Sequence, residues 1–266
     1  MISLQKKQKR RAKLYEKKTY KAIGILAGAI ALALSLYIGR EAICRLEAET
    51  IYANVAKEVW ATSQLPETSE NPVSQVVVPE ISNEQIPPGL ISLMTENQAV
   101  KGWITIPGTA IDYPILQNEK DNEFYLHRDL NGKKLYSGSI FLDTTSTIDG
   151  PGIISVYGHH MKAGYKYGTM FRDISKFQNT EFLKSHQDVT IYTDNKIYQY
   201  TPVLCISRKA DPSLRTQPES QEDLKTYFRE NYNFDIQNSD KVLVLITCAY
   251  NTDNARTYLF CLPELS

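Results

Sequence analysis

The sequence predicts a mainly β domain, an eight-stranded barrel or sandwich with helical inserts, preceded by one N-terminal transmembrane helix. Eight short runs of β-branched and aromatic residues recur between turn signals in the C-terminal two thirds of the chain. Near the N-terminus, an apolar stretch without a charged side chain follows a strongly basic head. With 42% hydrophobic, 10% aromatic and 23% charged residues, the composition excludes a disordered chain, a collagen-like chain and a multi-pass membrane protein.

The 30 basic and 30 acidic residues cancel over the chain but are unevenly distributed. Residues 1–21 carry nine basic side chains and one acidic one, whereas residues 22–98 carry three basic and nine acidic ones. The remaining residues, 99–266, hold eighteen basic and twenty acidic ones. A basic head on a mildly acidic body indicates a membrane-topology signal, not a polyanion binder, so we expect no nucleic-acid partner.

Residues 22–39 form the predicted membrane anchor. A helix over this uncharged stretch is about 27 Å long, close to the roughly 30 Å hydrocarbon core of a bilayer. The stretch is longer than the apolar part of a signal peptide, and no convincing cleavage site follows it, which favours a retained anchor over a cleaved leader. The basic residues of 1–21 then keep the N-terminus in the cytoplasm, so we expect a single-pass protein of the cell membrane whose folded domain is extracellular.

A stalk and linker are predicted at residues 40–89. Apolar residues recur at mostly helical spacing over 40–60, so this part should continue the anchor helix outward. Residues 61–89 are rich in Ser, Glu, Gln, Asn and Pro, a composition typical of an extended linker. The folded domain is expected at 90–266.

Within residues 90–266 the sequence pattern changes to short apolar runs separated by turn residues. A short helix is expected at 90–97, and helical inserts at 168–177 and 220–231, where apolar residues return every three to four positions. The predicted strands are 102–106, 111–116, 138–143, 153–157, 189–193, 197–206, 242–247 and 255–262.

Four cysteines occur in the chain: Cys44, Cys205, Cys248 and Cys261. An extracellular location permits disulfides. Cys44 lies beside the membrane, so three cysteines remain in the domain and at least one of them must be unpaired, which marks a candidate reactive thiol. Cys205 and Cys261 lie in apolar runs and could be small buried hydrophobic residues; whether they pair is left open.

A cysteine, one of two adjacent histidines and an arginine could form a site for acyl transfer. His159 and His160 follow the strand-like run that ends at Tyr157, and Cys248 ends the apolar run that begins at Val242. A thiolate is a strong nucleophile and an imidazole can move its protons. An antiparallel return of the last strand would bring Arg256 beside Cys248, where its permanent charge could stabilise an oxyanion.

Each of these signals is weak when taken alone. A lone cysteine at a strand end is more often structural, His159 and His160 could be surface residues of a turn, and Arg256 could be a charge that protects an edge strand. Their joint position at the ends of apolar strands in one domain favours the nucleophile hypothesis.

The pattern Y-G-H-x-M at 157–161, L-x-T-C at 245–248 and an Arg eight residues later resembles the sortase family of Gram-positive cysteine transpeptidases. Three further segments resemble class B sortases: 102–117, 122–126 and 137–143. The resemblance implies an eight-stranded sortase-type β-barrel. One departure from the usual T-L-x-T-C motif is Val244 in place of the first Thr, a change that suits a buried strand.

The resemblance also implies a mechanism and partners. Cys248 matches the nucleophile, His159 the catalytic histidine and Arg256 the catalytic arginine; His160 is a neighbour whose role is left open. The enzyme would cleave the C-terminal sorting signal of an exported protein after Thr and pass the acyl group to an amine, supplied by a peptidoglycan precursor or a pilin. No metal or cofactor is expected.

Two other functions remain as alternatives. Within the family, a pilin-polymerising enzyme competes with one that anchors proteins to the cell wall. Outside it, the domain could be a catalytically silent surface module that uses its groove for binding, although the complete set of Cys248, His159 and Arg256 argues against this. A papain-like hydrolase is disfavoured, because in that family the cysteine precedes the histidine and lies at a helix start.

Overall fold

The computed structural model describes residues 2–61, 85–161, 169–249 and 254–264. The chain divides into two compact units, Met1–Cys44 and Arg45–Ser266, and each is described by itself. Helix α1, Ile2–Trp60, begins in the first unit and ends in the second. Most of the predicted linker at 61–89 lies outside the described residues.

The first unit contains the apolar segment that was predicted to cross a membrane. Between Lys18 and Arg40, 23 residues of α1 are long and apolar enough for one span. Large apolar side chains along this segment, such as Ile25 and Leu36, are exposed. Water disfavours an apolar surface of this extent, so such a helix needs lipid or protein around it. The single N-terminal apolar helix of the predicted fold is therefore confirmed.

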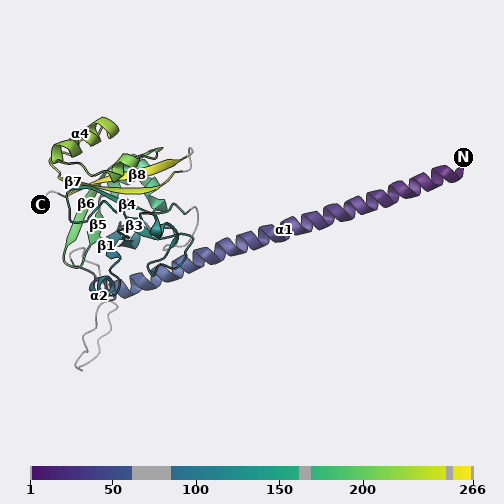
Figure 1. The fold of residues 1–266 in the computed structure, drawn as a ribbon, viewed down its shortest axis with the longest axis horizontal. Coiled ribbons are helices and arrows are strands. Elements are labelled where there is room, and N and C mark those ends of the chain that lie inside the picture. The colour runs from purple at the N-terminus through teal and green to yellow at the C-terminus, as the bar shows by residue number, and fades with distance from the viewer. Residues whose placement is uncertain (1, 62–84, 162–168, 250–253, 265–266) are drawn as a thin grey trace, which may run out of the picture. The chain divides into compact units, whose positions relative to one another are not determined.

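The second unit is built on a closed barrel of eight strands, as the sequence predicts (Figure 1). Around the barrel the strands follow the order β1-β2-β3-β4-β7-β8-β6-β5, and β5 pairs with β1. The observed ends differ from the predicted ones by up to three residues. The strands are β1 (Val100–Thr105), β2 (Asp112–Leu116), β3 (Ile140–Leu142), β4 (Gly152–Tyr157), β5 (Val189–Tyr192), β6 (Ile197–Lys209), β7 (Lys241–Cys248) and β8 (Ala255–Pro263).

Two strand pairs in the barrel are parallel, β2 with β3 and β4 with β7. The other neighbours pair antiparallel. Parallel strands cannot be joined by a tight hairpin, and residues 158–240 make the long connection from β4 to β7. The C-terminal ends of β4 and β7 consequently lie side by side at one end of the barrel.

Strand β7 is buried on both of its faces. Leu243 and Leu245 belong to the core inside the barrel, whereas Val242, Val244 and Ile246 belong to a second cluster on the outside. All five side chains are buried. Because both faces are covered, the strand appears in the sequence as a continuous apolar run instead of an alternating one.

Helix α4, Gln221–Tyr232, covers the outer face of β7 and β8 (Figure 1). Its Phe228 ring lies 5.7 Å from the ring of Phe260 in an edge-to-face contact. The Ser220 side chain accepts a hydrogen bond from the backbone N–H of Asp223 at the start of the helix, and Asn233 ends it in the left-handed conformation. The insert predicted at 220–231 is thus confirmed as a helix.

The insert predicted at 168–177 forms a different kind of helix. Residue 168 lies outside the described residues, and Arg172–Gln178 form a 3-10 helix, η3. The buried Phe171, Ile174 and Phe177 recur every three residues, which places them on one side of a helix with three residues per turn. Shorter helices fill other connections: α2 (Pro88–Glu96), η1 (Phe124–His127), α3 (Thr180–Ser185) and η4 (Pro212–Arg215).

The last turns of α1 pack against the barrel. Ala48, Tyr52 and Ala56 recur every four residues and are all buried, which gives this part of the helix one continuous apolar face. The Tyr52 hydroxyl donates a hydrogen bond to the carbonyl of Gly138 at 3.1 Å and lies 2.7 Å from the Ser139 hydroxyl. The end of the helix is therefore fixed to the segment that leads into β3.

We expect Tyr52→Phe to lower the unfolding free energy by about 1–2 kcal/mol, because it removes a buried hydroxyl and leaves the Gly138 carbonyl without that donor. Thermal unfolding of the full chain in detergent measures the change. Tyr200→Phe is the matched control, since Tyr200 is equally buried and its hydroxyl has no hydrogen-bond partner among the described residues. A midpoint that falls equally in both variants would contradict the prediction.

Candidate active site

The pairing of β7 with β8 brings Cys248 and Arg256 together. In the antiparallel register these two residues lie directly opposite each other. Side chains alternate along a strand, so Cys248 shares its side of β7 with Val244 and Ile246, and Arg256 shares its side of β8 with Tyr258 and Phe260. Both side chains therefore lie on the outer face of the barrel. The antiparallel return that the sequence predicts for Arg256 is confirmed.

The parallel pairing of β4 with β7 carries His159 to the same place. Tyr157 lies opposite Ile246, and the N–H of Gly158 donates to the carbonyl of Ile246 at 3.0 Å. His159 follows Tyr157 by two residues, as Cys248 follows Ile246. The three residues predicted from sequence thus come from the ends of three adjacent strands, at one end of the barrel.

Gly158 allows this tight exit from β4. A Cβ atom at this position would lie 2.5 Å from Cδ1 of Ile140 and 2.7 Å from Cγ of Phe171, both in the core. Such distances are too short for any side chain, so the backbone reaches its position only with glycine there. The glycine in Y-G-H is explained by this close packing beneath His159.

The His159 ring is held by a backbone carbonyl. Its Nε2 lies 2.8 Å from the carbonyl oxygen of Leu126, in η1. A carbonyl can only accept a hydrogen bond, so Nε2 carries the hydrogen and, in the neutral ring, Nδ1 holds the free electron pair. The His127 ring stacks on the His159 ring, with centroids 5.2 Å apart and planes 27° apart. The nitrogen available for proton transfer is Nδ1.

Burial lowers the pKa of His159 below its ordinary value of 6.5. The hydrogen bond to the Leu126 carbonyl opposes this shift, because it favours the protonated ring, whereas the positive charges of His127 and Arg256 add to it. The pKa thus places the His159 ring mostly in its neutral form at pH 7. A neutral imidazole with a free Nδ1 can accept the proton of a thiol.

Arg256 is a half-buried guanidinium whose Nη1 donates to the carbonyl of Ala255 at 3.0 Å. On the other side of β8, Arg256 lies opposite Arg208 in the antiparallel register with β6. Arg208 donates to the carbonyl of Asn231 at 2.7 Å and its guanidinium carbon lies 4.9 Å from the centroid of the Tyr232 ring, so it is engaged with the end of α4. Sequence reasoning did not consider Arg208, because nothing in the sequence indicates that β6 lies beside β8.

Cys205, Cys248 and Cys261 are all free thiols in the structure. Cys261 is buried in the barrel core and the partly buried Cys205 packs against it; burial raises the pKa of Cys205 to about 12 and that of Cys261 well above 9. Only the thiolate is a good nucleophile, so these two thiols are unreactive. Cys205 and Cys248 are both partly exposed, but only Cys248 ends a strand and lies opposite Arg256.

His160 has a different environment from His159. It forms an isolated antiparallel bridge with Met170, so its backbone helps to close the loop after β4. The intervening residues 162–168 lie outside the described part of the chain, as do residues 250–253 between β7 and β8. Within the described residues, no group of three or more His, Cys, Asp or Glu side chains is placed to hold a metal ion.

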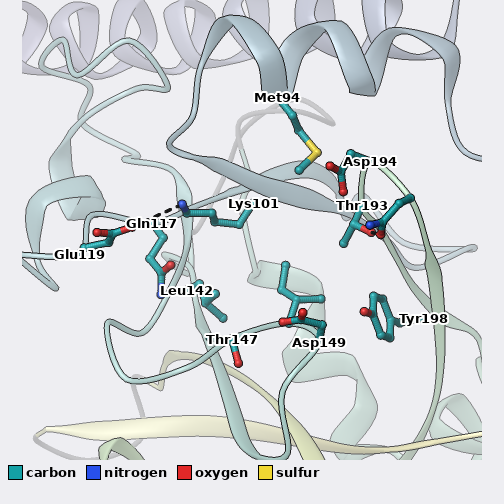
Figure 2. Close-up of a pocket in the computed structure, with 12 residues that line it drawn as sticks. Met94, Lys101, Gln117, Glu119, Leu142, Thr147, Asp149, Thr193, Asp194 and Tyr198 are labelled. Atoms are coloured by element: carbon teal, nitrogen blue, oxygen red, sulfur yellow. Dashed lines mark hydrogen bonds and ion pairs between the residues drawn. The ribbon is translucent and has the colours of Figure 1, made fainter.

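A pocket of about 360 Å³ lies at the other end of the barrel (Figure 2). Asp149 precedes β4, while Gln117 and Thr193 follow β2 and β5, so these lining residues mark the end opposite to the three predicted site residues. Figure 2 shows Lys101 and Glu119 facing each other across one side, with Nζ and Oε1 3.7 Å apart. The pocket is separate from the candidate active site.

Two features of the site were not predicted from the sequence. The Leu126 carbonyl and the His127 ring both contact His159, yet they lie more than thirty residues before it. A backbone carbonyl has no sequence signal, and His127 was known only as one of the four histidines of the chain. Knowledge of the strand order would have been needed to find them: η1 leads toward β3, and β3 pairs antiparallel with β4, which places η1 near the end of β4.

Comparison with known proteins agrees with this geometry. The family model of the sortase domain matches residues 104–263. Sortase B of Listeria monocytogenes is 31% identical over 182 residues, which cover 64% of this chain and 71% of the relative. Sortase B of Staphylococcus aureus is 28% identical over 186 residues, which cover 65% and 73%.

Solved structures of class B sortases are also similar to this chain. The crystal structure of Clostridium perfringens sortase B matches with 32% identity and a TM-score of 0.58, covering 66% of this chain and 98% of that one. A Staphylococcus aureus sortase B–substrate complex matches with 26% identity and a TM-score of 0.57, covering 68% and 86%. With a free thiol, an imidazole and a guanidinium gathered at the ends of β7, β4 and β8, the chain belongs to the sortase family and is a class B-like cysteine transpeptidase.

Proposed function

We propose that the enzyme cleaves the C-terminal sorting signal of an exported protein after Thr and transfers the acyl group to a cell-wall amine. The observation that carries this proposal is the cross-strand pair of Cys248 and Arg256 on the outer face of the barrel, beside the end of β4. A nucleophile and a fixed positive charge on adjacent strands suit a reaction that passes through an oxyanion.

In the first half of the reaction, Cys248 attacks the carbonyl carbon of the Thr. Nδ1 of His159 takes the thiol proton as the new S–C bond forms, and the carbonyl oxygen becomes an oxyanion. Collapse of this intermediate breaks the C–N bond. The proton on Nδ1 passes to the leaving amine, and a thioester on Cys248 remains.

In the second half, an amine of a peptidoglycan precursor attacks the thioester. Nδ1 of His159 takes a proton from the attacking nitrogen, and the C–S bond then breaks. The proton returns to the sulfur, so the free enzyme is regenerated. An amine from a pilin would follow the same path, and it is the competing acceptor.

Arg256 is assigned to the oxyanion. Its guanidinium keeps its charge at every relevant pH and can donate hydrogen bonds but not act as a base. Preorganised donors act most strongly where charge develops in the transition state, so Arg256 should affect kcat more than KM.

We expect Arg256→Ala to lower kcat/KM by about 100- to 1000-fold, the usual cost of losing one oxyanion donor. Arg256→Lys should recover part of this, because the charge remains while the geometry of the donors changes. Steady-state cleavage of a fluorogenic sorting peptide measures the effect. Arg208→Ala is the matched control: Arg208 lies opposite Arg256 on β6, but its guanidinium donates to the carbonyl of Asn231 and is not assigned to the oxyanion. A larger loss in Arg208→Ala would contradict the assignment.

Residues 22–39 are proposed as a retained anchor with the N-terminus in the cytoplasm. The candidate span between Lys18 and Arg40 and the basic head of residues 1–21 support this orientation. The catalytic domain would then be extracellular, where exported proteins and cell-wall amines are available to it.

A peptide-library assay tests the proposed function. The full chain in detergent is incubated with peptides that carry Thr at varied positions, with hydroxylamine as the acceptor, and the products are analysed by mass spectrometry. We expect hydroxamates whose C-terminal residue is Thr. Products that end at other residues throughout the library would refute cleavage after Thr, and products without hydroxamate would show a hydrolase.

A further inference from the structure

The ring of His127 lies against the ring of His159 in the candidate active site. Its centroid lies 5.2 Å from that of His159, and the planes are only 27° apart, so the two imidazoles stack. His127 is exposed, whereas the His159 ring is largely covered. One face of the proposed proton-transfer group is therefore in contact with a second titratable ring that the mechanism does not use.

The backbone that carries His127 is held firmly. The carbonyl of His127 accepts from the N–H of Leu135 at 3.0 Å, and the carbonyl of Tyr125 accepts from the N–H of Ser139 at 3.0 Å. The Ser139 hydroxyl donates to the carbonyl of Arg128 at 2.6 Å. These three bonds fix η1 on both sides of Leu126. The Leu126 carbonyl and the His127 ring are consequently presented to His159 by one rigid turn.

We propose that His127 is a positioning residue for His159: its ring and the Leu126 carbonyl together set the orientation of the catalytic imidazole. Because the two rings stack with centroids 5.2 Å apart, we expect a charge on one imidazole to influence proton uptake by the other. Stacking constrains the plane of the His159 ring, while the carbonyl constrains its rotation by binding Nε2. Nδ1 is thereby directed away from η1. This inference rests on the proposed role of His159 in proton transfer.

The charged groups around His159 define the expected coupling. His127 faces it from η1, Arg256 acts on it from β8, and Cys248 ends the neighbouring strand β7. Arg128 follows His127 but lies over the Phe124 ring and donates to the carbonyl of Gly132. A guanidinium cannot act as a base, whereas an imidazole can take up or release a proton, so we expect His127 to be the neighbour that couples to His159. Its positive charge lowers the pKa of His159.

Two substitutions separate the charge of His127 from its ring. His127→Phe keeps a flat ring for stacking but removes the charge, so the acid limb of the kcat/KM profile should move up by about half a pH unit, the size expected for unit charges about 5 Å apart in a watery environment. His127→Arg makes the charge permanent, so the acid limb should move down. Both should leave KM within about twofold of wild type.

A third substitution tests the ring. His127→Gln removes both the charge and the stacking surface. We expect its acid limb to shift as far as that of His127→Phe, and its plateau kcat to be about five- to tenfold lower than that of wild type. His186→Phe is the control, because His186 stacks on Phe182 and has no contact with the site among the described residues. If His127 had only a structural role, the acid limbs of His127→Phe and His127→Arg would shift in the same direction or would not shift. Either result would contradict the proposal.

The coupling can also be measured without activity. The chain has only four histidines, so the Cε1 carbons of the selectively labelled full chain in detergent give four signals whose shifts report each titration. We expect the His159 curve to be broadened by His127 and to become a single-site curve at higher pH in His127→Phe. An unchanged His159 titration curve in both His127→Phe and His127→Arg would overturn the proposal, even if the peptide-library assay confirms the proposed function.

Discussion

Replacing Cys248 with Ala is expected to lower kcat/KM for a sorting-signal peptide by at least about 10⁴-fold, because the reaction loses the atom that forms the thioester. Neither of the other two described thiols lies at the site, since Cys261 is buried in the barrel core and the partly buried Cys205 packs against that core. Cleavage and hydroxylamine-dependent transfer should disappear together. Cys248→Ser should be almost as inactive, because a hydroxyl is a far weaker nucleophile near neutral pH.

Cys205→Ala provides the matched control for this prediction. Burial raises the pKa of Cys205 to about 12, so this thiol stays protonated at any pH at which the enzyme works. We expect its kcat/KM to stay within about threefold of wild type once the variant is folded. Activity that survives in Cys248→Ala, or vanishes only in Cys205→Ala, would contradict the assignment of the nucleophile.

Replacing His159 with Gln should lower kcat by about 10²- to 10⁴-fold, the range for losing a general acid–base residue. Gln can still donate to the Leu126 carbonyl, so the loop is retained while proton transfer at Nδ1 is lost. His160→Gln should cost less than about tenfold, because His160 contributes its backbone to the bridge with Met170. The reverse pattern would assign catalysis to His160.

The same histidine predicts the pH dependence. Because burial lowers the pKa of His159, the neutral ring that accepts the thiol proton persists below pH 6.5. Activity should therefore fall on the acid side only as pH drops through this lowered pKa. A kcat/KM profile recorded between pH 4.5 and 8 checks this. An acid limb centred above 6.5 would contradict the neutral-base role.

Much of the fold follows from local sequence patterns. Each of the eight strands is a β-branched or aromatic run between turn signals, and α4 has its cap at Ser220 and its apolar residues at helical spacing. The joint occurrence of Cys248 and Arg256 was predictable, because adjacent antiparallel strands with a short connection pair by default.

The remaining features depend on contacts between distant segments. The parallel pairing of β4 with β7 spans more than eighty residues and has no local signal, yet it brings His159 to Cys248. The stacking of His127 on His159 depends on the position of η1, which is set by hydrogen bonds to Leu135 and Ser139. The packing of Tyr52 on the barrel was equally hidden, because an amphipathic helix after an anchor resembles a stalk.

Peptide mapping of the acyl-enzyme by mass spectrometry tests the central claim most directly. The full chain is mixed with a sorting-signal peptide, quenched in acid within one turnover and digested for mass spectrometry. The account predicts a hydroxylamine-sensitive acyl group that ends in Thr on the peptide containing Cys248, and none on Cys205 or Cys261. Rapid cleavage with an adduct on another residue, or without any adduct during the first turnover, would contradict it.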